Sequence, residues 1–170
     1  MDYSYNNCAN RAQGQYFEEI IARSLEYYLE KGWASIEKTP EPMKTIKNNG
    51  DGTFQAVFTK KAQPDYKGVL SGGQAIIFEA KYTEKDRIYQ NVVTKEQETY
   101  LERYASLNAR CFIMVCLQGS GFYRVPWTVW KGMKEAFGHK YMTRINLEHY
   151  KVPRKGIVHL LDGLEIFDCS

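Results

Sequence analysis

Apolar side chains in the first part of the chain recur at intervals of three and four residues, which is helical spacing. They are Phe17, Ile20, Ile21, Leu25 and Tyr28, and Ser24 shares the same stripe. This spacing predicts a helix from Asn10 to Lys31, and Gly32 stands where a glycine commonly ends a helix. We therefore expect a helix ahead of the first strand.

The next stretch combines short extended segments with turn-forming residues. A strand is predicted from Trp33 to Lys38, and two prolines follow it. Two further extended segments flank an Asn-Asn-Gly-Asp-Gly tip at 48–52, a composition that favours a turn between antiparallel strands. Because a lysine-rich pair of strands bounded by prolines has little to bury, we predict that residues 40–62 form a β arm that protrudes from the body.

The rest of the pattern predicts a sheet with helices packed on it. A second hairpin is predicted from 65–70 and 74–82, and its segment Ala75-Ile-Ile-Phe78 is apolar on both faces, which indicates a central strand. The remaining predicted elements are a helix at 94–107, strands at 110–117 and 121–125, a short helix at 127–137, and a tail at 156–161 that turns and returns through 164–167. This order predicts a mixed α/β (α+β) fold.

Composition supports a single domain inside the cell. The 170 residues are 44% hydrophobic and 25% charged, so we expect residues 1–170 to form one globular domain. Apolar runs fall far short of the roughly 20 residues that a bilayer requires, and no secretory signal opens the sequence. We expect a cytoplasmic protein without a membrane partner.

The cysteines form no C-x-x-C pair, which favours packing over zinc binding or disulfides at Cys8, Cys111, Cys116 and Cys169.

Positive charge gathers in two stretches, although the net charge is only +3. Residues 38–67 hold six lysines against three acids, and residues 131–155 hold seven basic side chains against two acids. Aromatic residues accompany the second stretch. Such a combination suits phosphate binding, and an ordinary solvated surface is the alternative interpretation.

The residues with the clearest chemistry lie on the second predicted hairpin. Side chains two apart on a strand share a face, so Glu79 and Lys81 point one way and Ala80 points the other. The intervening Gly-Gly turn would bring Asp65 alongside Glu79. Two adjacent carboxylates repel unless a cation lies between them, and Mg²⁺ prefers such oxygen ligands. Lys81 would then neutralise charge on a scissile phosphate or help to deprotonate the attacking water.

Two competing interpretations of this pattern can be stated. Asp65-Tyr66-Lys67 is a second acid-x-Lys motif, and Asp51 precedes Asp65 by the same 14 residues that separate Asp65 from Glu79. Asp51, however, lies in a flexible tip that cannot hold a metal ligand in place. The other alternative is a solvated salt bridge between Glu79 and Lys81 at a strand end. The apolar strand before Glu79 argues against it.

The surrounding residues resemble a known enzyme family. Pro64-Asp65 followed by Glu79-Ala80-Lys81 matches the PD-(D/E)xK nuclease signature. From about Asn10 to Pro153 the chain resembles the RecU-type Holliday junction resolvases of Gram-positive bacteria and their phages. The stretches that carry this resemblance are Asn10-Arg11, Gly14-Gln-Tyr-Phe-Glu18-Glu19, Thr39-Pro40, Asp65-Tyr66-Lys67-Gly68, Phe78-Glu79-Ala80-Lys81 and Gln97.

The resemblance implies a fold, a metal and a central set of site residues. The fold would be restriction-endonuclease-like, with a mixed central sheet flanked by helices and residues 40–62 as a stalk that enters the junction centre. Mg²⁺ would be the cofactor, and Mn²⁺ could substitute for it. Asp65 and Glu79 would be metal ligands, and Lys81 would stabilise the transition state.

Three further site residues follow from the same resemblance. Gln97 would belong to the metal site, although Thr94-x-x-Gln97 also has the spacing of a helix capping box. Gln63 replaces the threonine that the family has two residues before the aspartate, and it is the other candidate amide ligand. Glu18 and Glu19 cannot both face one point on a helix, and Glu18 is the better candidate catalytic acid.

The function implied by the resemblance is Mg²⁺-dependent resolution of four-way DNA junctions by paired symmetric cuts. The family acts as a homodimer, in a bacterial cell or in the host cell of a phage, and a recombinase of the host would be a further partner. Two alternatives stay open: a restriction-type or repair nuclease on duplex DNA, and a non-catalytic DNA-binding accessory protein. The complete set of Asp65, Glu79 and Lys81 argues against the second alternative.

Overall fold

The central feature of the computed structural model is a six-stranded sheet with the order β1-β4-β5-β7-β8-β10. The structure describes residues 3–58 and 63–164, with side chains at 13–57 and 63–164. The strands are β1 (Ala34–Lys38), β4 (Tyr66–Leu70), β5 (Ala75–Thr83), β7 (Arg110–Leu117), β8 (Gly121–Pro126) and β10 (Lys151–Val152). Only β5 and β7 are parallel neighbours, so the sheet is mixed, as predicted.

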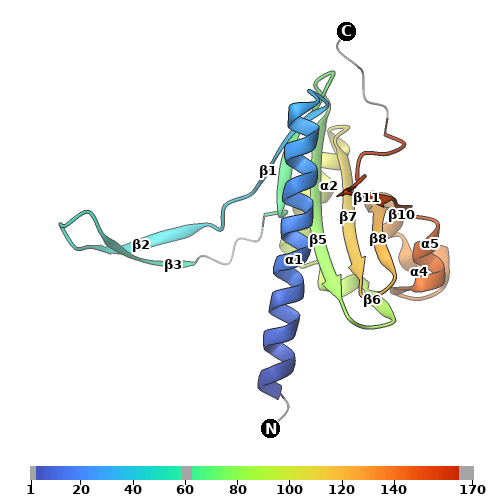
Figure 1. Cartoon of the computed structure of the whole chain (residues 1–170), viewed down its shortest axis with the longest axis horizontal. Helices are drawn as coiled ribbons and strands as arrows, with labels where there is room; N and C mark the ends of the chain where they lie inside the picture. The colour runs from blue at the N-terminus through green and yellow to red at the C-terminus, as the bar shows by residue number, and fades with distance from the viewer. Residues whose placement is uncertain (1–2, 59–62, 165–170) are drawn as a thin grey trace.

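Helices cover both faces of this sheet, which confirms the mixed α/β class (Figure 1). One face packs against α1 (Tyr3–Glu30), and the other packs against α2 (Lys95–Ser106), α3 (Trp127–Lys131), α4 (Met133–Phe137) and α5 (Arg144–Glu148). Within the described residues, no helix is long and apolar enough to cross a membrane. Two separate apolar cores result, one on each side of the sheet.

The first helix begins earlier than the apolar pattern predicted, at Tyr3 rather than Asn10. Its stripe is buried against the sheet as expected, with Ile21 at 0% exposure. Ser24 is polar but can be buried on that stripe because its hydroxyl group is fully hydrogen-bonded. It donates to the Ile20 carbonyl at 2.8 Å and accepts the backbone N–H of Val158 at 3.0 Å. This polar position thereby joins α1 to β12 (Ile157–Val158), a strand that pairs with β11 (Arg154–Lys155).

Strand β5 is central and apolar on both faces, as predicted. Ile76 and Phe78 belong to the core under α1, whereas Ile77 belongs to the core under α2. The Phe78 ring stacks between those of Tyr66 and Phe112, with centroids 4.6 and 4.7 Å away. Because the strand alternates so regularly, residue 79 faces the α2 side of the sheet.

Residues 43–58 form the two extended segments predicted for the arm, and the resulting ribbon leads away from the body (Figure 1). Its strands, β2 (Met43–Asn48) and β3 (Phe54–Phe58), pair with each other in a sheet of their own. At the tip, Asp51 accepts hydrogen bonds from the backbone and hydroxyl of Thr53 at 2.9 and 2.5 Å. Asp51 is therefore a turn residue and not part of the candidate site; residues 59–62 of the predicted arm lie outside the described chain.

Other elements differ from the predicted pattern. The helix expected at 127–137 is two short helices separated at Gly132. Strands β6 (Arg87–Tyr89) and β9 (Tyr141–Thr143), which pair with each other, were not predicted, nor were the 3₁₀ turn η1 (Gln90–Val92), α5 and β10. The predicted return of the tail through 165–167 lies outside the described residues.

The two cysteines whose side chains are described behave as packing residues. Cys111 and Cys116 are free, and they pack against the two apolar cores on opposite sides of the sheet. Burial raises the pKa of each thiol to about 11, so both stay protonated at neutral pH. This confirms the packing interpretation for these two; the side chains of Cys8 and Cys169 are not among those described.

Gly68 allows β4 to approach β1 unusually closely. A Cβ at this position would lie 2.1 Å from the Ser35 carbonyl oxygen and 2.5 Å from Ile36 Cα, both backbone atoms. We expect Gly68→Ala to lower the free energy of unfolding by about 2 kcal/mol or more. Gly14→Ala is the control, because a Cβ there meets nothing within 4 Å and should favour α1. Urea denaturation would measure both, and an unchanged Gly68→Ala protein would contradict the close approach.

Candidate active site

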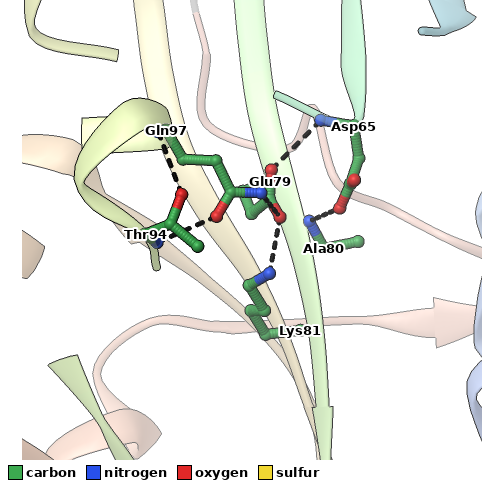
Figure 2. Close-up of polar contacts among 6 residues, drawn as sticks. All are labelled: Asp65, Glu79, Ala80, Lys81, Thr94 and Gln97. Atoms are coloured by element: carbon green, nitrogen blue, oxygen red, sulfur yellow. Dashed lines mark hydrogen bonds and ion pairs between the residues drawn. The ribbon is translucent and has the colours of Figure 1, made fainter. Parts of the chain in front are cut away.

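Asp65 and Glu79 come together where β4 begins beside the middle of β5. Tyr66 pairs with Phe78 across the two strands, which sets the preceding Asp65 level with Glu79. The backbone N–H of Asp65 donates to Glu79 Oε2 at 3.1 Å, and the N–H of Ala80 donates to Asp65 Oδ2 at 3.0 Å (Figure 2). These two reciprocal bonds hold both carboxyl groups in place from the rigid part of the sheet.

Glu79 is a carboxyl group buried under α2, with 1% exposure. Burial and the neighbouring charge of Asp65 raise its pKa to about 7, and the opposing effect of Lys81 is smaller. A buried carboxylate in this setting is stabilised by any cation that reaches it. Glu79 is thus the group whose charge the rest of the site must balance.

Lys81 supplies one such cation from the same strand. Its Nζ lies 2.6 Å from Glu79 Oε1, and its side chain is 23% exposed while that of Glu79 is almost enclosed. Ala80 packs against the core on the α1 side. The alternation predicted from the sequence therefore holds here. Because the Glu79 end of the pair is buried and only the Lys81 end is partly exposed, this is a half-buried ion pair and not the solvated salt bridge of the alternative interpretation.

Gln97 connects the start of α2 to Glu79. Its backbone N–H donates to the Thr94 hydroxyl at 3.3 Å, and its side-chain oxygen accepts the Thr94 N–H at 3.0 Å, which completes a capping box. Its Nε2 donates to Glu79 Oε1 (Figure 2). One amide therefore both caps the helix and contacts Glu79, but its oxygen, the atom that a metal would need, already accepts the Thr94 N–H.

The structure does not join Glu18 directly to this cluster. Glu18 extends from α1 and pairs with Lys38 at 2.5 Å, with roughly half of each side chain exposed. Its charge is nevertheless felt nearby: burial, then Glu18, Asp65 and Glu79 in that order, raise the pKa of the Tyr66 hydroxyl. Glu18 thus lies beside Tyr66 on the α1 side of the sheet, beyond the hydrogen-bonded set around Glu79.

Gln63 is also engaged elsewhere. Its Oε1 accepts a hydrogen bond from Lys67 Nζ at 2.7 Å. This contact occupies the amide oxygen that a metal would need. It also gives the lysine of the second acid-x-Lys motif a partner of its own, which separates Lys67 from the Glu79 pair.

One contact at the root of the arm was not predicted. The backbone N–H of Thr39 donates to the carbonyl of Asp65 at 2.7 Å. Thr39 follows β1 directly and precedes Pro40, so the chain enters the arm from a residue bonded to the site. The Thr39-Pro40 pair was the available sequence signal, but only the fold shows which residue it contacts.

The donor set suits a hard divalent cation that needs few protein ligands. Within the described residues, no group of three or more His, Cys, Asp or Glu side chains gathers around one point. Mg²⁺ is commonly held by one or two carboxylates, with water and substrate phosphate completing its shell. Asp65 and Glu79 provide such a pair, and the raised pKa of Glu79 shows that its negative charge is poorly compensated.

Comparison with known proteins gives consistent matches. The family model for RecU, recombination protein U, matches residues 12–168. The Holliday junction resolvase RecU of Streptococcus pneumoniae is 31% identical over 115 residues, covering 64% of this chain and 57% of that protein. Its counterpart in Streptococcus sanguinis is 32% identical over 115 residues, covering 64% and 56%. The chain thus spans little more than half the length of these relatives.

A solved structure, the Holliday junction resolvase Hjc of Archaeoglobus fulgidus, matches with a TM-score of 0.43 and 14% sequence identity, covering 69% of this chain and 75% of that chain.

Proposed function

The chain belongs to the recombination protein U family, and on that premise we propose that it is a divalent-metal-dependent endonuclease that cuts four-way junctions in DNA. The observation that carries the proposal is the buried Glu79 carboxylate, held between Asp65 and Lys81. A structural role would be served better by apolar residues here, because an ionised carboxyl group under a helix is costly to bury. Active sites commonly contain such buried charges, because the reaction requires them despite the cost in stability.

In this proposal each side chain has a distinct role. Asp65 and Glu79 would hold Mg²⁺, or Mn²⁺ in its place, and the ion would supply electrostatic stabilisation of the scissile phosphate and activation of water. Gln97 keeps Glu79 oriented through its amide N–H. Lys81 is the partly exposed member of the pair, and its ammonium group would stabilise negative charge that develops on a phosphate.

The outer residues have supporting roles in the same proposal. Glu18, beyond the hydrogen-bonded set, would take part as a further acid once the Lys38 pair opens. Gln63 would become a ligand only on release from Lys67. We expect both substitutions, Glu18→Gln and Gln63→Ala, to have smaller effects on cleavage than any change at Asp65, Glu79 or Lys81.

The arm is proposed to act at the centre of the junction. Lys44 and Lys47 stand on β2, while Met43 and Phe54 are 59% and 58% exposed. Lysines would neutralise phosphates where four strands converge. We propose residues 1–170 as one nuclease domain with residues 40–62 as its stalk, acting in the bacterial or host-cell cytoplasm alongside a recombinase.

The proposed working unit is a homodimer. Two identical sites related by two-fold symmetry would be held at a fixed separation, which suits paired cuts on opposing strands of a symmetric junction. Cross-linking or sedimentation in the presence of junction DNA would test this, and an active monomer would contradict it.

A competition experiment separates this function from the alternatives. Labelled four-way junction is incubated with the protein and Mg²⁺ in the presence of unlabelled junction or unlabelled duplex of matched length and sequence. We expect only the junction to compete efficiently. Equal competition by duplex would indicate a restriction-type or repair nuclease, and binding without any cleavage would indicate an accessory protein.

The two functions of Gln97 can be separated by comparing it with Thr94. Thr94→Ala removes the cap and should cost about 1 kcal/mol of stability while leaving the Glu79 contact. Gln97→Ala keeps the bond from the backbone N–H of residue 97 to the Thr94 hydroxyl, but it removes the other half of the capping box and frees Glu79. We therefore expect a loss of about 10- to 100-fold in cleavage rate that Thr94→Ala does not show. Initial rates on the junction, taken well below each melting temperature, would measure this. Equal rates for the two variants would reduce Gln97 to a helix cap.

A further inference from the structure

The β6–β9 ribbon presents an aromatic face that the site chemistry does not use. In this ribbon Ile88 pairs with Met142, and both are buried, at 2% and 0% exposure. Tyr89 pairs with Tyr141 at the neighbouring position and therefore faces the other way. Tyr89 is 44% exposed, so a large ring faces solvent on a short, well-anchored strand pair.

The rings on this face contact one another and the guanidinium group of Arg87. The imidazole of His139 lies parallel to the Tyr141 ring, with centroids 3.7 Å apart and planes 5° apart. The Arg87 guanidinium carbon lies 5.1 Å from the same ring centroid, and the Tyr89 ring lies 5.7 Å from it. Tyr141 is therefore the fixed centre of these contacts, and Tyr89 offers the exposed ring at its side.

Basic residues flank strand β9, which carries Tyr141, in the sequence: Lys140 precedes the strand and Arg144 follows it. Arg87 is paired with Asp86 at 2.8 Å, but Lys140 and Arg144 form no salt bridge within the described part of the chain. Lys140 also lines a groove along α2 that contains Lys95, Lys131 and Arg103 together with Glu98 and Glu102. The ribbon thus has an exposed ring on its outer face and unpaired positive charge on the residues next to β9, a combination suited to the bases and phosphates of single strands.

The segments before and after β6 both connect directly to elements that carry candidate site residues. Strand β5, which carries Lys81, ends at Thr83, and β6 begins at Arg87. After β6, the chain passes through η1 to Thr94, which caps the helix that carries Gln97. Figure 1 shows β6 beside the end of the sheet where β5 and β7 terminate.

Three hydrogen bonds from Gln90 hold the ribbon in this position. The backbone N–H of Gln90 donates to the Lys140 carbonyl at 2.9 Å, and its side chain donates to the carbonyls of Trp130 and Lys131. These bonds join the ribbon to α3 on the α2 side of the sheet. The ribbon therefore lies on the same side of the sheet as the Glu79 carboxyl group.

We propose that the outer face of the β6–β9 ribbon binds an unstacked stretch of the DNA strand next to the cleavage site. A base would stack on the Tyr89 ring, and Lys140 and Arg144 would contact the flanking phosphates. The proposal rests on the proposed nuclease function, since it assigns this surface to the same substrate. It concerns a local single-stranded segment, whereas the arm is assigned to the junction centre.

The test measures binding of a fluorescently labelled oligothymidylate in EDTA, where no cleavage is expected. Tyr89→Ala should weaken binding about tenfold, because stacking on one aromatic side chain is worth about that factor. Tyr89→Phe keeps the ring and should bind like the wild type. Tyr16→Ala removes an exposed tyrosine from α1, on the other face of the sheet, and should leave binding unchanged.

The basic residue is tested through salt dependence. Lys140→Ala should reduce the slope of log affinity against log salt by about 0.7, the value for one phosphate contact on a single strand. Lys31→Ala, at the end of α1, should leave the slope unchanged. If the wild type cuts junctions but Tyr89→Ala and Lys140→Ala bind oligothymidylate normally, the ribbon proposal is overturned and the nuclease function stands.

Junction cleavage by the wild type is measured alongside. A Tyr89-dependent affinity with no cleavage of any junction would overturn the nuclease function while retaining the ribbon as a strand-binding surface. Failure of the wild type to bind oligothymidylate at low salt would overturn the ribbon proposal directly.

Discussion

Glu79→Gln, Asp65→Asn and Lys81→Met are each expected to lower the rate of junction cleavage by about a thousandfold or more. Each change removes a charge while keeping the approximate size of the side chain. Asp65→Asn retains an oxygen that can accept the Ala80 N–H, so the loss would report chemistry and not a broken strand contact. Initial rates on a labelled four-way junction at saturating Mg²⁺ would measure the effect.

Lys31→Met provides the matched control for this series. Lys31 lies beyond the end of α1, and its ammonium contacts the Tyr27 ring at 5.6 Å. This variant should cut at the wild-type rate, and all three site variants should still bind the junction. Any site variant that cleaves at the normal rate would remove its residue from the proposed machinery.

The buried Glu79 carboxyl group is expected to make the metal-free protein less stable as pH rises. Its folded-state pKa of about 7 lies above the ordinary value of 4.5, so the unfolded chain releases this proton first. Stability from Glu79 is fully present below about pH 4.5 and is lost as pH rises to about 7. The shift corresponds to about 3 kcal/mol.

Urea denaturation in EDTA at pH 5 and pH 8 would measure this loss. Glu79→Gln cannot ionise at this position and should reduce the difference in stability between the two pH values by about 2.5 kcal/mol, because part of the effect is already lost at pH 5. Mg²⁺ should restore part of the stability of the wild type at pH 8, because it would bind the ionised form. An identical pH profile for the two proteins would show that the burial of Glu79 does not perturb its pKa.

The centre of the fold was predictable because its signals are local. Four apolar residues before Glu79 indicated a buried strand, and the Gly-Gly turn placed Asp65 on its neighbour. Thr94 and Gln97 marked the start of α2 through a spacing that depends on a single helical turn. Such patterns depend only on residues that are close in the sequence, so the elements predicted from them agree with the structure.

The parts that were missed depend on contacts between distant segments. Arg87–Tyr89 is too short to stand out, and it is a strand because it pairs with Tyr141–Thr143 more than 50 residues later. The partner of Glu18 could not be read from α1, since Lys38 reaches it from β1. Gln63 is a local exception, because Lys67, only four residues later, donates to its amide oxygen.

The most direct test of the central claim is incubation with a synthetic four-way junction labelled on each strand in turn, with Mg²⁺ and with EDTA. The account predicts paired cuts at symmetric positions on two opposing strands with Mg²⁺, and intact DNA with EDTA. Cleavage that persists in EDTA, or cuts that fall on single strands without pairing, would contradict it.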